Sequence, residues 1–157
     1  LYEGGIREPL IIRWPGNIKA GSVNHTPVSS VDFYPTFASA AGVKLHGKEK
    51  LDGVDLLPLL IKNKDINREA MYWHYPSETG NWINKMSSAI RKGDYKLIEF
   101  YKDHRLELYN IENDVGEKIN LADQMPEKTQ ELKKMLENWK KSVKAEVPQT
   151  KKVKKDK

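Results

Sequence analysis

Between residues 71 and 111 the sequence alternates short strand-forming runs with tight turns, and this pattern limits the fold more than any other feature. Gly93-Asp94 is a pair typical of a two-residue hairpin turn. Because short turns connect neighbouring antiparallel strands, the pattern predicts an antiparallel β-meander. Its four predicted strands are residues 71–75, 87–92, 95–101 and 106–111.

A single amphipathic helix is predicted after these strands. Pro126 suits the first position of a helix, where its missing N–H is not needed. Glu127 near the start and Lys140 near the end complement the helix dipole. We expect the apolar side of this helix to cover one face of the meander. That side is formed by Leu132, Met135, Leu136, Trp139 and Val143.

The first sixty residues predict elements of another kind. Residues 10–12 are Leu-Ile-Ile, followed by Trp-Pro-Gly, which predicts a strand inside a sheet covered on both faces. A helix is predicted to begin at Ser29 or Ser30, with Asp32 in its first turn, and to end at Gly42. Its apolar stripe is expected to comprise Phe33, Phe37, Ala40 and Ala41.

The chain divides at a polar stretch between residues 62 and 68. We expect a first part over 1–62, a second over 63–145 and a disordered basic tail over 146–157. The fold class is therefore mixed: α/β in character, with an α+β second part in which the short antiparallel meander is covered by the carboxy-terminal helix.

Composition excludes several classes of protein. The 157 residues contain no cysteine, which excludes disulfides and thiolate sites within them. No apolar run approaches the ~20 residues of a membrane span. The net charge of +5 arises from the tail, because the residues after 139 include eight Lys and only two acidic residues. Because no aromatic residue is interleaved there for base stacking, we expect no nucleic-acid partner.

Catalytic or metal-binding residues are not predicted within the chain. Ser87 or Ser88 could in principle pair with a histidine (His25, His46, His74 or His104), but no nucleophile-elbow spacing supports a nucleophile. Gly4-Gly5 lacks the further residues of a phosphate loop. The oxygen-rich stretch 110–120 does not match a calcium loop, and capped turns are expected there instead.

His74 is the strongest candidate for a ligand contact. It lies among aromatic residues at the end of a predicted strand, directly before a loop that contains Trp82. Indole and phenol faces pack well against sugar rings, and strand ends that open into loops are common binding positions. The alternative is a half-buried strand histidine with one hydrogen bond.

Several collinear blocks resemble the type I sulfatases, which belong to the alkaline-phosphatase-like superfamily. The first is the run from Tyr2 to Gly16, YEGGIREPLIIRWPG, in which Glu8 replaces an apolar residue usual in the family. The blocks that follow in the same order are VDFYPTF at 31–37, LDGVDLLP at 51–58, SAIRKGDYKLI at 88–98, ELYNI at 107–111 and DVGE at 114–117.

This resemblance implies that residues 1–62 are a strand–helix remnant of a large sulfatase domain and 63–145 its carboxy-terminal subdomain. The family hydrolyses sulfate esters with a formylglycine nucleophile and a calcium ion. The residues that supply them, and an active-site Lys, are expected before Leu1. The fragment alone should therefore be inactive and hold no cofactor. Because the first residue is Leu and not Met, the start of the chain is expected to be an engineered or a processing boundary.

The resemblance also implies partners and a location. The expected partners are the amino-terminal catalytic part of the same protein and a sulfated sugar or aryl sulfate, with His74, Trp73 and Trp82 as candidate substrate contacts. The parent is expected to be exported to a periplasm, a lysosome or the exterior. The isolated fragment should self-associate through residues 10–12. The alternatives are a stand-alone carbohydrate-binding module and a polyanion binder.

Overall fold

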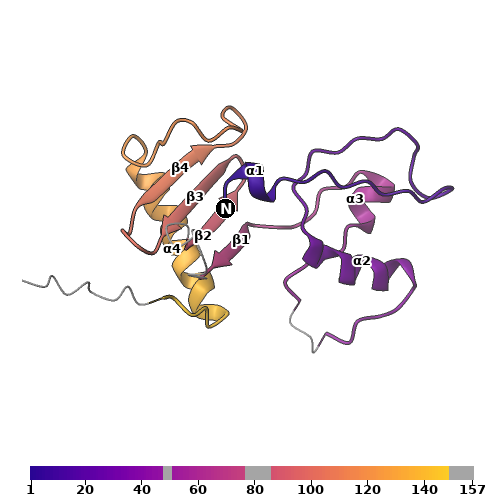
Figure 1. Ribbon diagram of the computed structural model, residues 1–157. Coiled ribbons are helices and arrows are strands. Elements are labelled where there is room, and N and C mark those ends of the chain that lie inside the picture. Colours follow the sequence, from indigo (N-terminus) through magenta and orange to yellow (C-terminus); the bar gives the residue numbers. More distant parts are fainter. Residues whose placement is uncertain (48–50, 77–85, 149–157) are drawn as a thin grey trace, which may run out of the picture. The chain divides into compact units, whose positions relative to one another are not determined.

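The computed structural model describes residues 1–47, 51–76 and 86–148, and the chain divides into two compact units (Figure 1). One unit combines Leu1–Glu8 with the residues from Glu69 onward, and the other is Pro9–Arg68. The sequence instead predicts a boundary after residue 62 and assigns the first eight residues to the other part. The difference arises because Tyr2 and Glu3 bond to side chains of the sheet, more than ninety residues later.

The first unit contains a four-stranded antiparallel sheet in the order β1-β2-β3-β4, which confirms the predicted meander. The register pairs Ile90 with Leu97 and Lys92 with Tyr95 across the hairpin. Gly93 in the turn has a φ of 57°, a left-handed conformation that glycine adopts without strain. The strands are β1 (Met71–Tyr75), β2 (Ser87–Lys92), β3 (Tyr95–Phe100) and β4 (Leu106–Asn110).

Helix α4 (Pro126–Ser142) covers one face of this sheet, as predicted. Its Leu132 and Leu136 are fully buried. Trp139, one turn further along, stacks on Tyr72 of β1 with ring centroids 4.9 Å apart and planes inclined by 6°. The core between helix and sheet is formed by Ile90, Leu97, Leu108, Leu132 and Leu136.

Replacing Trp139 by Ala tests this packing. We expect the free energy of unfolding to fall by about 3 kcal/mol, near the lower limit for a buried aromatic residue, because the indole is only partly buried. Urea unfolding followed by circular dichroism measures the change. Val143→Ala is the control, since Val143 is exposed beyond the helix end. An equal effect of both substitutions would refute the stacking as a source of stability.

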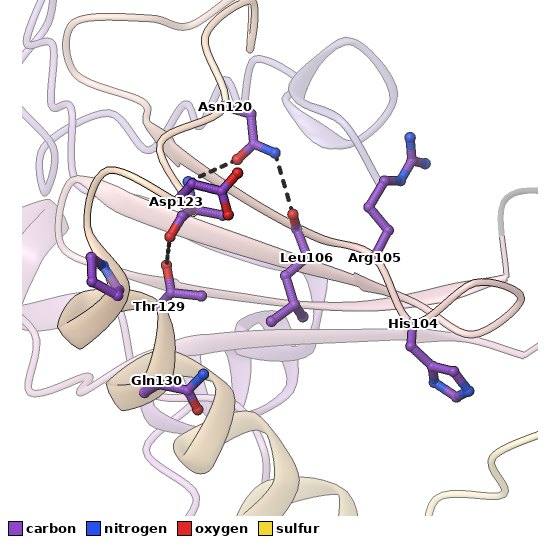
Figure 2. A pocket seen from close by; sticks show the side chains of 9 residues that line it. His104, Arg105, Leu106, Asn120, Asp123, Thr129 and Gln130 are labelled. Atoms are coloured by element: carbon purple, nitrogen blue, oxygen red, sulfur yellow. Dashed lines mark hydrogen bonds between the residues drawn. The ribbon is translucent and has the colours of Figure 1, made fainter.

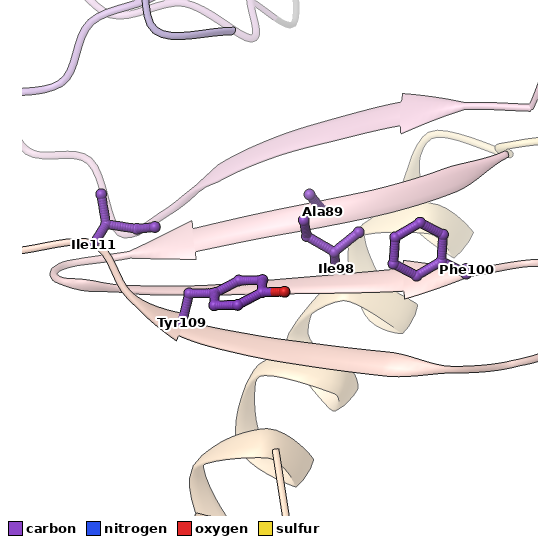
Figure 3. Close-up of a cluster of buried hydrophobic side chains, with 5 residues drawn as sticks. All are labelled: Ala89, Ile98, Phe100, Tyr109 and Ile111. Carbon is purple, nitrogen blue, oxygen red and sulfur yellow. The ribbon is translucent and has the colours of Figure 1, made fainter. Parts of the chain in front are cut away.

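The opposite face of the sheet is also buried (Figure 3). Trp73 and Leu1 pack against its central apolar cluster. The amino-terminal segment Leu1–Glu8, here called the strap, contains the one-turn helix α1 (Glu3–Ile6). Tyr2 of the strap contacts the rings of Phe100 and Tyr109. The apolar cluster consists of Ala89, Ile98, Phe100, Tyr109 and Ile111.

In the Pro9–Arg68 unit, the regular elements among the described residues are short helices joined by coil. A short 3-10 turn (Ser30–Asp32) leads into α2 (Phe33–Ala40), and α3 (Leu57–Lys62) follows. The Ser29 amide donates to Asp32 Oδ2 at 2.7 Å, which confirms the predicted helix start. The predicted stripe is wrong, however. Phe37 is 67% exposed, and the helix instead buries Pro35 and Thr36.

The predicted strand over residues 10–12 is not formed. Leu10, Ile11 and Ile12 are coil and all exposed, with Ile11 exposed to 90%. A strand needs a neighbouring strand to accept its backbone hydrogen bonds, and none of the described residues pairs with this segment. The strand–helix remnant is therefore reduced to its helix in this structure.

Two expectations concern the ends of the chain and membrane spans. Of the predicted tail over 146–157, residues 149–157 lie outside those described. In the part of the chain that the structure describes, no helix is both long and apolar enough to cross a membrane.

Candidate functional site

His74 lies on edge strand β1, on the face covered by α4, within a small polar cluster. Its Nδ1 is 2.8 Å from both Ser88 Oγ and Tyr101 Oη. Its Nε2 is 3.0 Å from the carbonyl oxygen of Glu146, beyond the end of α4. The histidine therefore links the sheet to the chain after the last helix, and makes more contacts than the single hydrogen bond of the alternative interpretation.

The protons in this cluster follow from its partners. A carbonyl oxygen only accepts, so Nε2 carries the hydrogen and donates it to Glu146. In the neutral ring Nδ1 then accepts from one of the two hydroxyl groups, which also bond to each other. Burial raises the pKa of Tyr101, while its bond to Ser88 lowers it. Tyr101 is therefore a neutral phenol at physiological pH.

This cluster is not a nucleophile–base pair, although Ser88 and His74 are in contact. Ser88 is 0% exposed, and its hydroxyl group also bonds to Tyr101. A substrate could not reach it without opening the sheet. Both ring nitrogens of His74 are occupied by hydroxyl and carbonyl groups, so the carboxylate that orients the base in a catalytic triad has no place.

The structure does not bring the three candidate contacts together. Trp73 adjoins His74 in β1, but successive side chains of a strand point to opposite faces. Trp73 packs against the Figure 3 cluster, whereas His74 lies on the helix side. Trp82 lies outside the described residues. His74 is the candidate whose described position directs a ring nitrogen, Nε2, at an exposed residue, Glu146.

A second polar cluster, absent from the sequence analysis, lies on the strap side of the sheet. Lys96 on β3 is 0% exposed, and its Nζ is 2.9 Å from both Glu3 Oε1 and Glu117 Oε1. Arg91 Nη1 lies 3.6 Å from Glu3 Oε2. The backbone N–H of Glu3 donates to Glu117 Oε2 at 2.5 Å. Glu99 is a second charged residue of β3, so the sequence gives no signal that sets Lys96 apart as buried.

Glu107 forms a third buried contact with the strap. Its Oε2 accepts hydrogen bonds from the phenols of Tyr2 at 2.6 Å and Tyr109 at 2.9 Å. Arg105 lies 3.2 Å from its other oxygen. Burial and the bond to Glu107 raise the pKa of Tyr2 to about 12, and the same causes raise that of Tyr109. The phenols therefore hold the carboxylate as neutral donors.

Alkaline pH should release this contact. The pKa of Tyr2 is higher in the folded state, about 12, than its ordinary value of 10.0. The stabilisation is therefore complete below about pH 10 and is lost as the pH rises towards 12. We expect the stability difference between the parent protein and Tyr2→Phe to shrink across this range in urea unfolding. Tyr75→Phe, on the exposed end of β1, is the control; a difference for Tyr2→Phe that stays constant with pH contradicts the expectation.

The oxygen-rich stretch after β4 forms capped turns, as predicted. Asp114 Oδ2 accepts the backbone N–H groups of Lys118 at 2.8 Å and Ile119 at 2.9 Å. These two bonds lower the pKa of Asp114. Asn120 Oδ1 accepts from the Leu108 amide at 3.0 Å and so covers the outer edge of β4. Within residues 1–47, 51–76 and 86–148, no group of three or more His, Asp or Glu side chains is placed to hold a metal ion.

An open pocket of about 480 Å³ lies between β4 and the start of α4 (Figure 2). Its polar groups are largely bonded to each other. Asn120 Nδ2 donates to the carbonyl of Leu106 at 3.3 Å, and Thr129 Oγ1 donates to that of Ala122 at 3.1 Å. The side chains of His104 and Arg105 point apart. The pocket therefore lacks the convergent polar groups of a ligand site.

Comparison with known proteins identifies the family. Residues 1–145 match the family described as N-sulphoglucosamine sulphohydrolase, C-terminal. A sulfatase of Formosa agariphila is 38% identical over 136 residues, covering 80% of this chain and 24% of the relative. An N-acetylglucosamine-6-O-sulfatase of Bacteroides thetaiotaomicron is 36% identical over 157 residues, covering 96% of this chain and 28% of the relative.

A solved structure extends the similarity to the fold. The solved protein was determined in complex with its substrate D-glucosamine-2-N,6-O-disulfate. It aligns with this chain at a TM-score of 0.70 and 34% identity, and the alignment covers 90% of this chain and 30% of the solved one. The chain thus spans 24–30% of the length of these relatives. The family model matches the sequence over residues 1–145, and the sheet and helix align with a solved sulfatase structure. The chain therefore belongs to the carboxy-terminal sulfatase family, as the resemblance predicted.

Proposed function

We propose that the full-length protein hydrolyses sulfate esters and that this chain is its carboxy-terminal part. The observation that carries the proposal is the family match over residues 1–145. In this proposal the formylglycine, the calcium ion and the residues that bind them come from the amino-terminal part, which is the main partner of this chain. Export of the parent protein is proposed on the same resemblance.

A sulfated amino sugar is the proposed substrate class. The substrate in the name of one relative and the substrate bound in one solved structure are both glucosamine derivatives with a sulfate at O6. The test is sulfate release by the purified full-length protein from glucosamine 6-sulfate, glucosamine 2-sulfate and 4-nitrophenyl sulfate. We expect turnover of the 6-sulfate to exceed that of the others. Absence of sulfate release from all three contradicts the proposed activity.

The contribution of this chain is to complete the fold and to border the substrate cleft with the end of β1. His74 is the proposed contact, since its Nε2–H donates to a backbone carbonyl near an exposed segment. The carbonyl oxygen of Glu146 occupies the position that a sugar hydroxyl oxygen would take as acceptor. The buried bonds of Nδ1 to Ser88 and Tyr101 hold the ring in that orientation.

Replacing His74 by Ala should impair the sugar substrate selectively. We expect kcat/KM for the sulfated amino sugar to fall roughly tenfold, the effect of losing one hydrogen bond of about 1.4 kcal/mol. Turnover of 4-nitrophenyl sulfate should change less, because in this proposal His74 contacts the sugar and not the sulfate group. Steady-state kinetics of the full-length enzyme measures both.

His104→Ala is the matched control for this substitution. His104 is an exposed turn residue with a left-handed φ of 57°, and it is not proposed to contact substrate. Equal kinetics of His74→Ala and the parent enzyme on the sugar substrate would exclude the contact. Equal losses on the sugar and aryl substrates would instead indicate a general structural role.

A further inference from the structure

The end of α4 turns the chain back toward the sheet. Lys144, two residues beyond the last helical residue Ser142, has a φ of 53°, a left-handed conformation that glycine adopts more readily than lysine. The Lys144 amide donates to the Lys141 carbonyl at 3.2 Å, and the Ala145 amide donates to the Lys140 carbonyl at 2.9 Å. These two bonds form the Schellman motif of helix termination, which fixes the direction in which the chain continues.

The residues after this turn reach His74. The segment 145–148, here called the latch, places the carbonyl oxygen of Glu146 at 3.0 Å from His74 Nε2, 72 positions away in the sequence. Glu146 and Val147 of the latch are exposed. Within the described part of the chain the latch makes two hydrogen bonds, this one and that of the Ala145 amide. Because a segment with few bonds and little burial opens locally at small cost, the latch is among the least stable parts of the sheet unit.

His74, in contrast, is held firmly on its other side. Its Nδ1 bonds to Ser88 and Tyr101, whose exposed fractions are 0% and 3%. The Tyr101 ring also packs edge-on against the imidazole, with ring centroids 5.7 Å apart and planes inclined by 68°. The imidazole therefore cannot turn to offer its other nitrogen without breaking buried bonds. Nε2 carries a single hydrogen, so it serves one acceptor at a time.

We propose that the latch is an internal competitor of the substrate at His74. This inference rests on the proposed function, because it takes His74 as the contact for a sugar hydroxyl group. The Glu146 carbonyl oxygen and the sugar hydroxyl oxygen accept the same hydrogen, so the sugar binds only when the latch is open. Since the substrate binds the open form alone, it shifts the population toward that form.

Competition of this kind has a defined kinetic effect. The apparent affinity for the sugar equals its intrinsic affinity multiplied by the open fraction. A hydrogen bond between neutral groups contributes little net free energy, so the closed form exceeds the open form by about threefold to tenfold. The latch has left the site before the reaction occurs, so it raises KM and leaves kcat unchanged. A contact that only supports the fold would leave KM unchanged.

The first test compares two shortened forms of the full-length protein. One ends after Lys144 and lacks the latch, whereas its matched control ends after Pro148 and keeps the latch. Both lack the Lys-rich residues 149–157, so the charge of the tail cannot cause a difference. We expect the form without the latch to have a KM for glucosamine 6-sulfate about threefold to tenfold lower, with equal kcat. Equal KM values for the two forms overturn the proposal.

Substitutions at the turn test the same competition without shortening the chain. Lys144→Gly removes the strain of the left-handed conformation and favours the closed form, so KM for glucosamine 6-sulfate should rise roughly threefold. Lys144→Val increases the strain, because a β-branched residue is strongly disfavoured at this φ, so KM should fall roughly threefold. A change of KM in the same direction for both variants, or in neither, contradicts the latch.

A measurement without substrate separates this proposal from the proposed function. Hydroxyl-radical footprinting should label the His74 ring about twofold more in the form that ends after Lys144 than in its matched control. His104, an exposed turn residue, is the internal standard and should be labelled equally in both. Equal labelling of His74 overturns the latch even if the protein hydrolyses sulfate esters. Increased labelling without sulfate release from any substrate shows that the latch covers His74 and that the proposed function, and competition with it, are wrong.

Discussion

Replacing Lys96 by Met is expected to lower the free energy of unfolding by about 3–5 kcal/mol, the cost of removing one partner from a buried ion pair. The substitution keeps the length of the side chain and removes the positive charge that contacts both Glu3 and Glu117. Glu117 Oε1 is buried and, among the described residues, has no other partner. Glu117 would then lose its counter-charge, and Glu3 would keep only the longer contacts of Arg91 at 3.6 Å and Arg7 at 3.8 Å.

Urea unfolding measures this effect, and two further variants serve as controls. Lys133→Met removes a surface pair with Glu137 at 3.9 Å and should change stability by less than about 1 kcal/mol. Combining Lys96→Met with Glu3→Gln and Glu117→Gln removes the uncompensated charges and should recover part of the loss. A combined variant less stable than Lys96→Met would show that the cost lies in packing and not in charge.

Asp32→Ala is the second substitution with a large expected effect. It leaves the amides of Ser29 and Val54 without acceptors and the Arg68 guanidinium without its counter-charge. The expected cost to the Pro9–Arg68 unit is about 3 kcal/mol or more. Hydrogen exchange measured residue by residue in the full-length protein should show the Val54 amide exchanging roughly a hundredfold faster, as 1.4 kcal/mol corresponds to a factor of ten.

Asp65→Ala is the control for this experiment, because Asp65 is exposed in the same unit. Amides of the sheet, such as that of Leu97, should keep their exchange rates in both variants. If the Val54 amide exchanges at the parent rate in Asp32→Ala, the carboxylate does not organise the unit. Its stability must then come from the buried Leu56 and Leu59 and from the close contact of the Gly53 and Val31 backbones.

The elements that depend on neighbouring residues could be predicted from the sequence. Gly93-Asp94 fixes the central hairpin, and the spacing of Leu132 and Leu136 fixes the face that α4 turns to the sheet. Both signals act over a few residues, so local conformational preference and tertiary packing agree. The position of His74 at the end of β1 was predictable for the same reason.

The buried charges could not be predicted in this way. Whether Lys96 is buried depends on Glu3, 93 residues away, and on Glu117, and no local pattern connects them. The strand predicted over residues 10–12 failed for the opposite reason. Its apolar sequence is typical of a covered strand, but pairing requires an edge that the described residues do not provide.

The strap has a consequence for the order of folding during synthesis. Its Glu3 leaves the ribosome before any strand of the sheet, yet its bond to Glu117 spans 114 positions of the chain. At about 5–20 residues per second, the strap waits on the order of ten seconds before its binding site on the sheet exists. The Pro9–Arg68 unit emerges within this interval, between two pieces of one sheet unit. Closing this loop is a long-range step, so docking of the strap is expected to be a late event in folding.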